Sequence, residues 1–293
     1  MALEFDLSLA PVYGVEQRLS PRIARLLAPN PSAFTFRGTG VYIVGAGDHV
    51  AVIDPGPDLP EHVAALKRAL DGRAVSHILI THTHKDHSPA AQPLKEWSGA
   101  KTYGFGPHAE TNDVEEGGDR LFVPDIRVAD GDEIAGEDFS IACVFTPGHT
   151  SNHMCYALAG EQALFTGDHV MGWSTSVIAP PDGNMGDYLR SLEKLIARDD
   201  AILYPTHGSP IAPPAPFLRA LVTHRRMREG QIAACLAQGD DTAPVLVARL
   251  YAGLAPMLVK AAELTVLAHL EHMMEDGKVT RDGARYRPIV KAP

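Results

Sequence analysis

The sequence predicts an α/β fold followed by a smaller, mostly helical domain. Two observations support this fold class. As far as residue 204, short apolar runs that end in turn residues alternate with amphipathic segments of helical period. Five prolines then fall within residues 205–216, and beyond them the apolar pattern is helical. We therefore divide the 293 residues into a first domain, 1–216, and a second domain, 217–293.

The first domain is predicted to alternate strands and helices. Residues 61–70 and 188–197 place apolar side chains at helical spacing. Asn184 precedes the second of these helices as a predicted N-cap, with Asp187 three residues further on. The predicted strands are residues 41–44, 49–53, 77–80, 139–145, 154–158, 163–166 and 201–204.

The second domain is predicted to be a winged-helix-like module. Three helical segments are followed by a turn at Gly277 and by two short segments that have the length of a wing. A plain helical appendage with a frayed end is the alternative interpretation. The predicted helices are 217–236, 244–254 and 256–275, and the predicted wing strands are 278–280 and 285–287.

Composition argues against several classes of protein. The net charge of -10 divides into -13 over residues 1–216 and +3 over residues 217–293, and an acidic body disfavours salt-driven binding to nucleic acid. No apolar run approaches the roughly 18 residues of a membrane-spanning helix, and the first ten residues lack the basic character of a targeting peptide. Three cysteines are too few for a disulfide framework. We therefore expect a cytoplasmic protein with no membrane partner.

A histidine-rich run follows the strand predicted at residues 77–80. It reads Thr-His-Thr-His-Lys-Asp-His and offers His82, His84, Asp86 and His87 as ligands. Side chains two residues apart in an extended segment project to the same side, so His82 and His84 can bind one metal ion together. Asp86 and His87 follow where the chain turns and can reach a second ion. Imidazole and carboxylate ligands together suit zinc, manganese or iron.

Three further candidate ligands each follow an apolar strand and a tight turn. His149 comes after a Thr-Pro-Gly turn, Asp168 comes after Thr-Gly, and His207 comes after Pro-Thr. A lone residue of this kind is more often an ordinary loop residue. Because ligands at the same ends of neighbouring strands converge in space, we expect these three to complete two metal sites with the histidine-rich run.

Two residues are predicted to support the ligands from behind. Asp54 ends the strand 49–53 and is expected to hydrogen-bond a ligand histidine, the alternative being a simple turn aspartate. His153 opens the strand 154–158 and is expected to brace the site rather than bind metal. Three arginines are candidates for binding a phosphate or another part of the substrate, unless they form a solvated helix face: Arg225, Arg226 and Arg228.

The seven candidate ligands resemble the complete ligand set of the metallo-β-lactamase superfamily of di-metal hydrolases. This resemblance implies a four-layer αβ/βα sandwich for the first domain. It also implies two metal sites that share one carboxylate. In that scheme the first metal is held by His82, His84 and His149, the second by Asp86, His87 and His207, and Asp168 bridges both.

Several other segments resemble the endoribonuclease subgroup called β-lactamase-like protein 2, which carries a winged-helix-like C-terminal module. The resemblance implies an activity on single-stranded RNA. Thr83 and His169 depart from the family's pattern, and we expect both to face the pocket. The segments that carry the resemblance are residues 19–22, 28–31, 38–40, 224–229, 231–232, 269–271 and 275–278.

The expected activity is hydrolysis by a metal-bridging hydroxide at a di-metal centre, most readily zinc, with manganese or iron as alternatives. Asp86 is expected to orient the attacking water or take its proton. The subgroup resemblance favours a phosphodiesterase or endoribonuclease acting on single-stranded RNA. The alternative is a thioester or lactone hydrolase of the hydroxyacylglutathione hydrolase type, with at most promiscuous β-lactamase activity. A non-catalytic winged-helix reader of DNA is a third interpretation.

Overall fold

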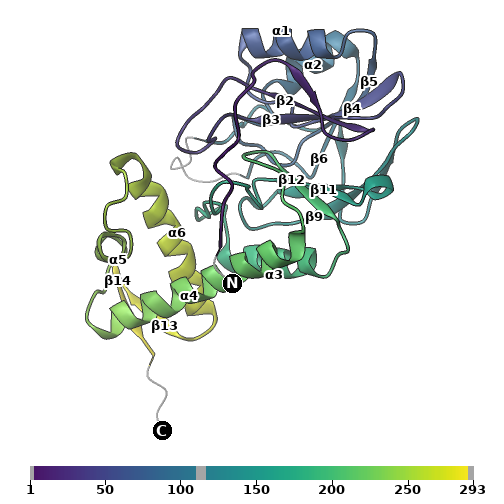
Figure 1. Cartoon of the computed structure of the whole chain (residues 1–293). Coiled ribbons are helices and arrows are strands. Elements are labelled where there is room, and N and C mark those ends of the chain that lie inside the picture. Colours follow the sequence, from purple (N-terminus) through teal and green to yellow (C-terminus); the bar gives the residue numbers. More distant parts are fainter. Residues whose placement is uncertain (1–2, 110–116, 290–293) are drawn as a thin grey trace.

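The computed structural model describes residues 3–109 and 117–289, and within them two β-sheets lie face to face (Figure 1). The first sheet is ordered β1 (Glu16–Arg18), β2 (Ile23–Leu27), β3 (Gly40–Val44), β4 (His49–Ile53), β5 (Ala74–Leu79), β6 (Lys101–Gly104) and β7 (Ile126–Arg127). The second sheet is ordered β12 (Ile202–Pro205), β11 (Ala163–Gly167), β10 (Met154–Leu158), β9 (Ser140–Phe145) and β8 (Glu133–Ala135).

Helices cover the outer face of each sheet, which confirms the four-layer sandwich (Figure 1). The alternation of strand residues creates these layers, because successive side chains point to opposite faces. In β3, Tyr42 packs in the core between the sheets, whereas Ile43 packs in the core beneath the helices of the first sheet. These outer helices are α1 (Pro60–Ala69) and α2 (Ala91–Ser98) over the first sheet, and α3 (Met185–Ile196) with part of α4 (Pro214–Ala237) over the second.

Helix α3 begins as its capping residue predicts. The side chain of Asn184 accepts a hydrogen bond from the backbone N–H of Asp187 at 2.8 Å, so the helix starts at Met185, three residues before the predicted start. Its inner face buries Tyr188 and Leu192 against the second sheet. The helix therefore closes the fourth layer of the sandwich.

The C-terminal part is the predicted winged-helix-like module. It consists of the end of α4, followed by α5 (Ala243–Leu250), α6 (Pro256–Glu275) and a hairpin of β13 (Val279–Asp282) and β14 (Arg285–Pro288). A core that includes Ile232, Leu246, Val266 and Tyr286 joins helices and hairpin, so this part is more than a helical appendage. The predicted boundary after residue 216 falls in the first turn of α4, and a single helix therefore runs from one part into the other (Figure 1).

Several short elements were not predicted from the sequence: β1, β2, α2, β6, β7 and β8. Strand β7 has two residues and β8 has three, too few to show an apolar period. In β2 the charged Arg25 interrupts an otherwise apolar run, yet it is buried and bonds to the backbone carbonyl of Gly208. Pairing with neighbouring strands thus stabilises segments whose own sequences are weak strand formers.

Strands of both sheets place their carboxyl ends at one edge of the sandwich. Strands β4 and β5 are parallel and align Ile53 with Leu79, and strands β11 and β12 are parallel and align Phe165 with Tyr204. The segments that follow these four strands therefore leave the sheets side by side. No helix within the described residues has the length and apolar character needed to cross a membrane.

Candidate metal centre

Three histidines from two segments form a first group of ligand atoms. The segment after β5 places His82 Nε2 2.9 Å from His84 Nδ1, as the two-residue spacing predicts. His149, which follows β9 in the other sheet, places its Nε2 3.2 Å from the same His84 nitrogen. The ligand atoms of this group lie within 4.8 Å of one another, which is close enough to hold one metal ion.

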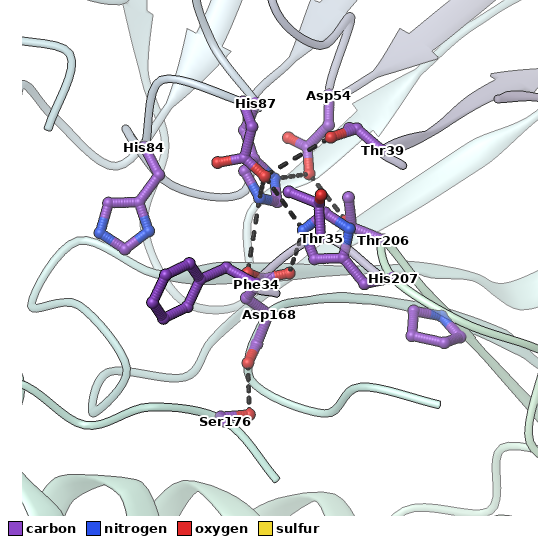
Figure 2. A network of polar contacts seen from close by, with 12 residues as sticks. Phe34, Thr35, Thr39, Asp54, His84, His87, Asp168, Ser176, Thr206 and His207 are labelled. Carbon is purple, nitrogen blue, oxygen red and sulfur yellow. Dashed lines mark hydrogen bonds and ion pairs between the residues drawn. The ribbon is translucent and has the colours of Figure 1, made fainter. Parts of the chain in front are cut away.

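A second group of ligand atoms includes His87 and His207, which Figure 2 shows close to each other. The Oδ2 of Asp86 lies 3.0 Å from His207 Nε2 and 3.4 Å from His87 Nε2. His207 follows β12, so this group also joins the two sheets. These three residues again keep their ligand atoms within 4.8 Å. The side chains of each triad that the resemblance implied therefore lie close together, and His82, His87 and Asp168 form a third group within the same distance.

Asp168 lies between the two groups. Its Oδ2 is 3.9 Å from His149 Nε2 in the first group and 3.6 Å from His87 Nε2 in the second. Its Oδ1 is 3.4 Å from His207 Nε2. A carboxylate that reaches ligands of both groups has the position required of a bridge between two metals.

A tight turn brings His149 into the cluster. Gly148, which precedes it, has φ +138, and a Cβ at this position would lie 2.3 Å from the Cα of Tyr188 in α3. Only glycine fits so close to the backbone of the helix. The predicted Thr-Pro-Gly turn is therefore the reason that His149 leaves β9 in the direction of the other ligands.

Four of the five histidines use Nε2 toward the cluster and tie Nδ1 to an oxygen behind the ring. Such bonds fix the ring orientation and the tautomer of metal-binding histidines. Only His84 turns Nδ1 inward. The Nδ1 partners are Thr81 Oγ1 for His82 at 3.0 Å, Asp54 Oδ2 for His87 at 2.9 Å, the Val177 carbonyl for His149 at 2.6 Å and the Gly38 carbonyl for His207 at 3.1 Å.

The two predicted supporting residues both contact the cluster from behind. Asp54 is fully buried and accepts from His87, so it orients a candidate ligand rather than only closing a turn. His153 is also fully buried and its ring stacks on His82 at 5.2 Å. It bonds to Thr146 through Nδ1 and belongs to none of the ligand groups.

Burial keeps one histidine of the cluster neutral, and the two carboxylates attract positive charge to the others. Burial and the neighbouring His149 lower the pKa of His84 to about 3, so its imidazole is neutral and free to bind metal at pH 7. Burial opposes a charge on His87, yet nearby Asp86 and Asp168 outweigh it and raise its pKa. Burial also opposes a charge on Asp168, yet nearby His207 and His87 outweigh it and hold its pKa well below its ordinary value, and the same two histidines lower the pKa of Asp86. Both carboxylates are therefore ionised.

Two buried atoms in the cluster lack hydrogen-bond partners, namely His87 Nε2 and Asp168 Oδ1. Unpaired polar atoms are costly inside a protein unless an ion or water satisfies them. Both atoms belong to the ligand groups described above. The donor set, imidazole with carboxylate, and these unsatisfied atoms fit a pair of divalent transition metals.

The surroundings of the cluster differ from the expectation for two residues and include two residues that were not anticipated from the sequence. Thr83 and His169, expected to face the pocket, are both buried. Thr83 Oγ1 bonds to His108 and Asn152, forming a polar layer beneath the ligand loop. His169 packs against the ring of Tyr188 at 4.7 Å. No sequence motif surrounds His108 or Asn152, so only the fold shows that they support the loop.

The three candidate arginines do not act as one cluster. Arg225 is 2% exposed and donates to the Ser176 carbonyl, so it is not part of a solvated helix face. Arg226 is on the surface and pairs with Glu193 at 2.8 Å. Arg228 lies over the ring of Tyr251.

Comparison with known proteins shows the family of this chain. Residues 35–207 match the model of the metallo-beta-lactamase superfamily, a range that contains all seven candidate ligands. The chain belongs to the metallo-beta-lactamase superfamily. Residues 242–287 match a winged helix domain associated with beta-lactamases. This superfamily consists of hydrolases, and its members typically bind divalent metals.

Superfamily relatives cover most of the chain. The lactamase-like protein nscB of Neosartorya fischeri is 35% identical over 75% of this chain and 63% of its own length, so the match spans less than two thirds of that protein. An atrochrysone carboxyl ACP thioesterase of Claviceps purpurea is 31% identical over 76% of this chain and 67% of its own. A beta-lactamase-like protein 2 homolog of Caenorhabditis elegans is 30% identical over 93% and 90%, which agrees with the subgroup resemblance.

A solved structure shows the same fold over nearly the whole chain. A beta-lactamase domain protein from Burkholderia ambifaria has a TM-score of 0.82 and 20% identity, covering 96% of both chains. The likeness therefore extends over both the sandwich and the C-terminal module.

Proposed function

We propose that this protein is a di-metal acyl hydrolase whose substrate is a thioester. One observation carries the hydrolytic part: Asp168 reaches ligands of both triads, so the seven side chains can hold two cations around a shared carboxylate. The thioester part is supported by the relative named a carboxyl ACP thioesterase, which is 31% identical over 76% of this chain.

Each side chain has a role in this proposal. The first metal would be held by His82, His84 and His149, and the second by Asp86, His87 and His207, with Asp168 shared. Two divalent cations supply Lewis acidity toward a carbonyl and make bound water more acidic.

Asp86 would orient the attacking water or accept its proton. Its side chain is 26% exposed whereas that of Asp168 is 11% exposed, so Asp86 is the carboxylate that water reaches more easily. Thr39 Oγ1 donates to the Oδ2 of Asp86 at 3.4 Å and limits its rotation.

The test is thiol release from an acyl-N-acetylcysteamine thioester by the metal-loaded protein. Wild type is expected to release thiol, and Asp168→Ala is expected to lower kcat/KM by at least about a hundredfold. Asp130→Ala, which removes an exposed carboxylate paired with Lys194, serves as the matched control and keeps wild-type turnover. Equal turnover of wild type and Asp168→Ala with both metals bound would refute the proposal.

Cleavage of single-stranded RNA is the second candidate, favoured by the similarity to a beta-lactamase-like protein 2 homolog over 93% of this chain. Burial of Arg225 weighs against it, since a buried guanidinium cannot track a phosphate backbone from the surface. Incubating the same preparations with a short single-stranded RNA separates the two reactions. RNA cleavage without thiol release would make the protein a phosphodiesterase.

Two further attributes belong to this proposal. Zinc is the proposed metal because its preferred ligands are imidazole nitrogen and carboxylate oxygen. A cytoplasmic location is proposed because the three cysteines are buried and unpaired, as is usual in a reducing compartment. Elemental analysis of protein purified without added metal tests the first attribute.

A further inference from the structure

A cavity of about 270 Å³ lies where the catalytic sandwich meets the C-terminal module. One wall is the segment 174–177, which follows β11. The opposite walls come from α4 and from the turn between α5 and α6 with the first turns of α6. Apolar side chains that line it include Tyr251, Leu254, Leu258 and Ala262.

Two arginines of α4 line the same cavity. Arg225 and Arg228 are three residues apart and so lie on one face of the helix. Arg225 is nearly fully buried and is held against the ring of Tyr188 at 5.0 Å. The guanidinium of Arg228 lies 4.3 Å from the ring centre of Tyr251 and donates to the Leu250 carbonyl. Both charges are therefore fixed in position.

These two positive charges are not neutralised. Arg226 pairs with Glu193, whereas neither Arg225 nor Arg228 has a carboxylate partner among the described residues. The cavity lining contains no Asp or Glu in the part of the chain that is described. The Nε atoms of Arg225 and Arg228 are buried and have no hydrogen-bond partner. Burying the Arg225 cation without a counter-charge is costly, and the half-buried Arg228 adds a second positive charge beside it, so the cavity is suited to an anion.

We propose that this cavity binds a small organic carboxylate. The carboxylate would pair with Arg225 and Arg228, whose planar guanidinium groups match its two oxygens. The apolar body would pack against Leu254 and Leu258. A volume of about 270 Å³ is at the small end for ligand pockets and suits a short acid rather than a long chain.

The proposed site shares a wall with the metal centre. Ser176 Oγ donates to the backbone carbonyls of Asp168 and His169, and the Val177 carbonyl bonds to His149 Nδ1. Figure 2 shows Ser176 directly beneath Asp168. An occupant of the cavity therefore contacts the segment that holds two candidate ligands. The proposal does not depend on the reaction proposed above, because it concerns binding alone.

The test is calorimetric titration of the protein with hexanoate, with its neutral analogue hexanamide and with inorganic phosphate. Hexanoate is expected to bind at one site, hexanamide not to bind, and phosphate to bind more weakly than hexanoate. Arg228→Met should weaken hexanoate binding by at least about tenfold, since a charge-assisted hydrogen bond is lost. Arg219→Met, the same change at an exposed position of α4, serves as the control and should leave it unchanged.

A second variant tests the apolar part of the site. Ala261→Phe places a ring in the cavity from its half-exposed rim and should abolish hexanoate binding. Thermal unfolding of each variant shows whether it is folded. Equal binding of hexanoate and hexanamide, phosphate binding as tight as hexanoate, unchanged affinity in Arg228→Met, or no binding of hexanoate to the wild type would each overturn the proposal.

Discussion

Replacing Asp54 with alanine tests how the fold supports the metal centre. The Asp54 carboxylate is fully buried and accepts four hydrogen bonds. Thr81 donates through its backbone N–H at 2.8 Å and its hydroxyl at 2.7 Å, Thr206 donates through its hydroxyl at 3.2 Å, and His87 Nδ1 lies 2.9 Å away. These bonds link the two sheets to one candidate ligand of the second triad (Figure 2).

The expected loss follows from the donors that would be left unpaired. The two threonine hydroxyls can rotate toward other acceptors, but the N–H groups of Thr81 and His87 cannot. An unpaired buried donor costs about 1–3 kcal/mol, so the free energy of unfolding should fall by about 3–5 kcal/mol once the lost bonds are included. Loss of a carboxylate behind a ligand histidine typically weakens metal binding by about 10–100-fold.

Urea unfolding of the metal-free protein measures the first effect, and competition with a chromophoric chelator measures the second. Asp54→Asn is the matched variant, because it keeps one acceptor oxygen for Thr81 while removing the charge beside His87. It should lose less stability than Asp54→Ala and still bind metal more weakly than wild type. Wild-type metal affinity in a destabilised Asp54→Ala protein would refute the reasoning and leave Asp54 as a simple turn residue.

Two further predictions concern stability. Asn184→Ala should cost about 1 kcal/mol in urea unfolding by removing the cap of α3, and an unchanged midpoint would contradict the cap. Burial opposes a charge on Glu229, but hydrogen bonds from His269 and His272 lower its pKa to about 2. The hydrogen bond to Glu229 in turn raises the pKa of His272. The pair therefore stabilises the fold fully between the ordinary values of 4.5 and 6.5. This stabilisation is lost as pH falls toward 2 or rises through the raised pKa of His272. Glu229→Gln should destabilise more at pH 5.5 than at pH 9, and an equal loss at both pH values would exclude this ion pair.

The candidate ligands could be selected from the sequence because they follow recognisable strands and turns. The spacing of His82 and His84 reflects the two-residue period of extended backbone, which needs no tertiary information. His149, Asp168 and His207 could be grouped because strand ends at one edge of a sandwich converge. The superfamily resemblance then supplied the division into two triads, and the structure brings those triads together.

Tertiary packing alone decided the environment of these residues. The sequence placed Arg225, Arg226 and Arg228 in one basic run, but packing of α4 against α3 and α6 buries Arg225 and leaves Arg226 on the surface. It likewise turns Thr83 and His169 into the interior. Whether a side chain meets water depends on which distant element covers it, and a pattern of neighbouring residues does not contain that information.

Local chemistry therefore determined which residues of this protein can bind metal, and the fold determined what stands behind them. The contact between Asp54 and His87 joins residues 33 positions apart in sequence, and the contact between Thr206 and Asp54 joins residues 152 positions apart. Both exist because parallel pairing of β4 with β5, and the stacking of the second sheet on the first, bring these chain segments to one edge. Short segments of sequence determine which side chains are candidate ligands. The packed chain determines how those side chains are oriented and which charges line the cavity between the sandwich and the C-terminal module.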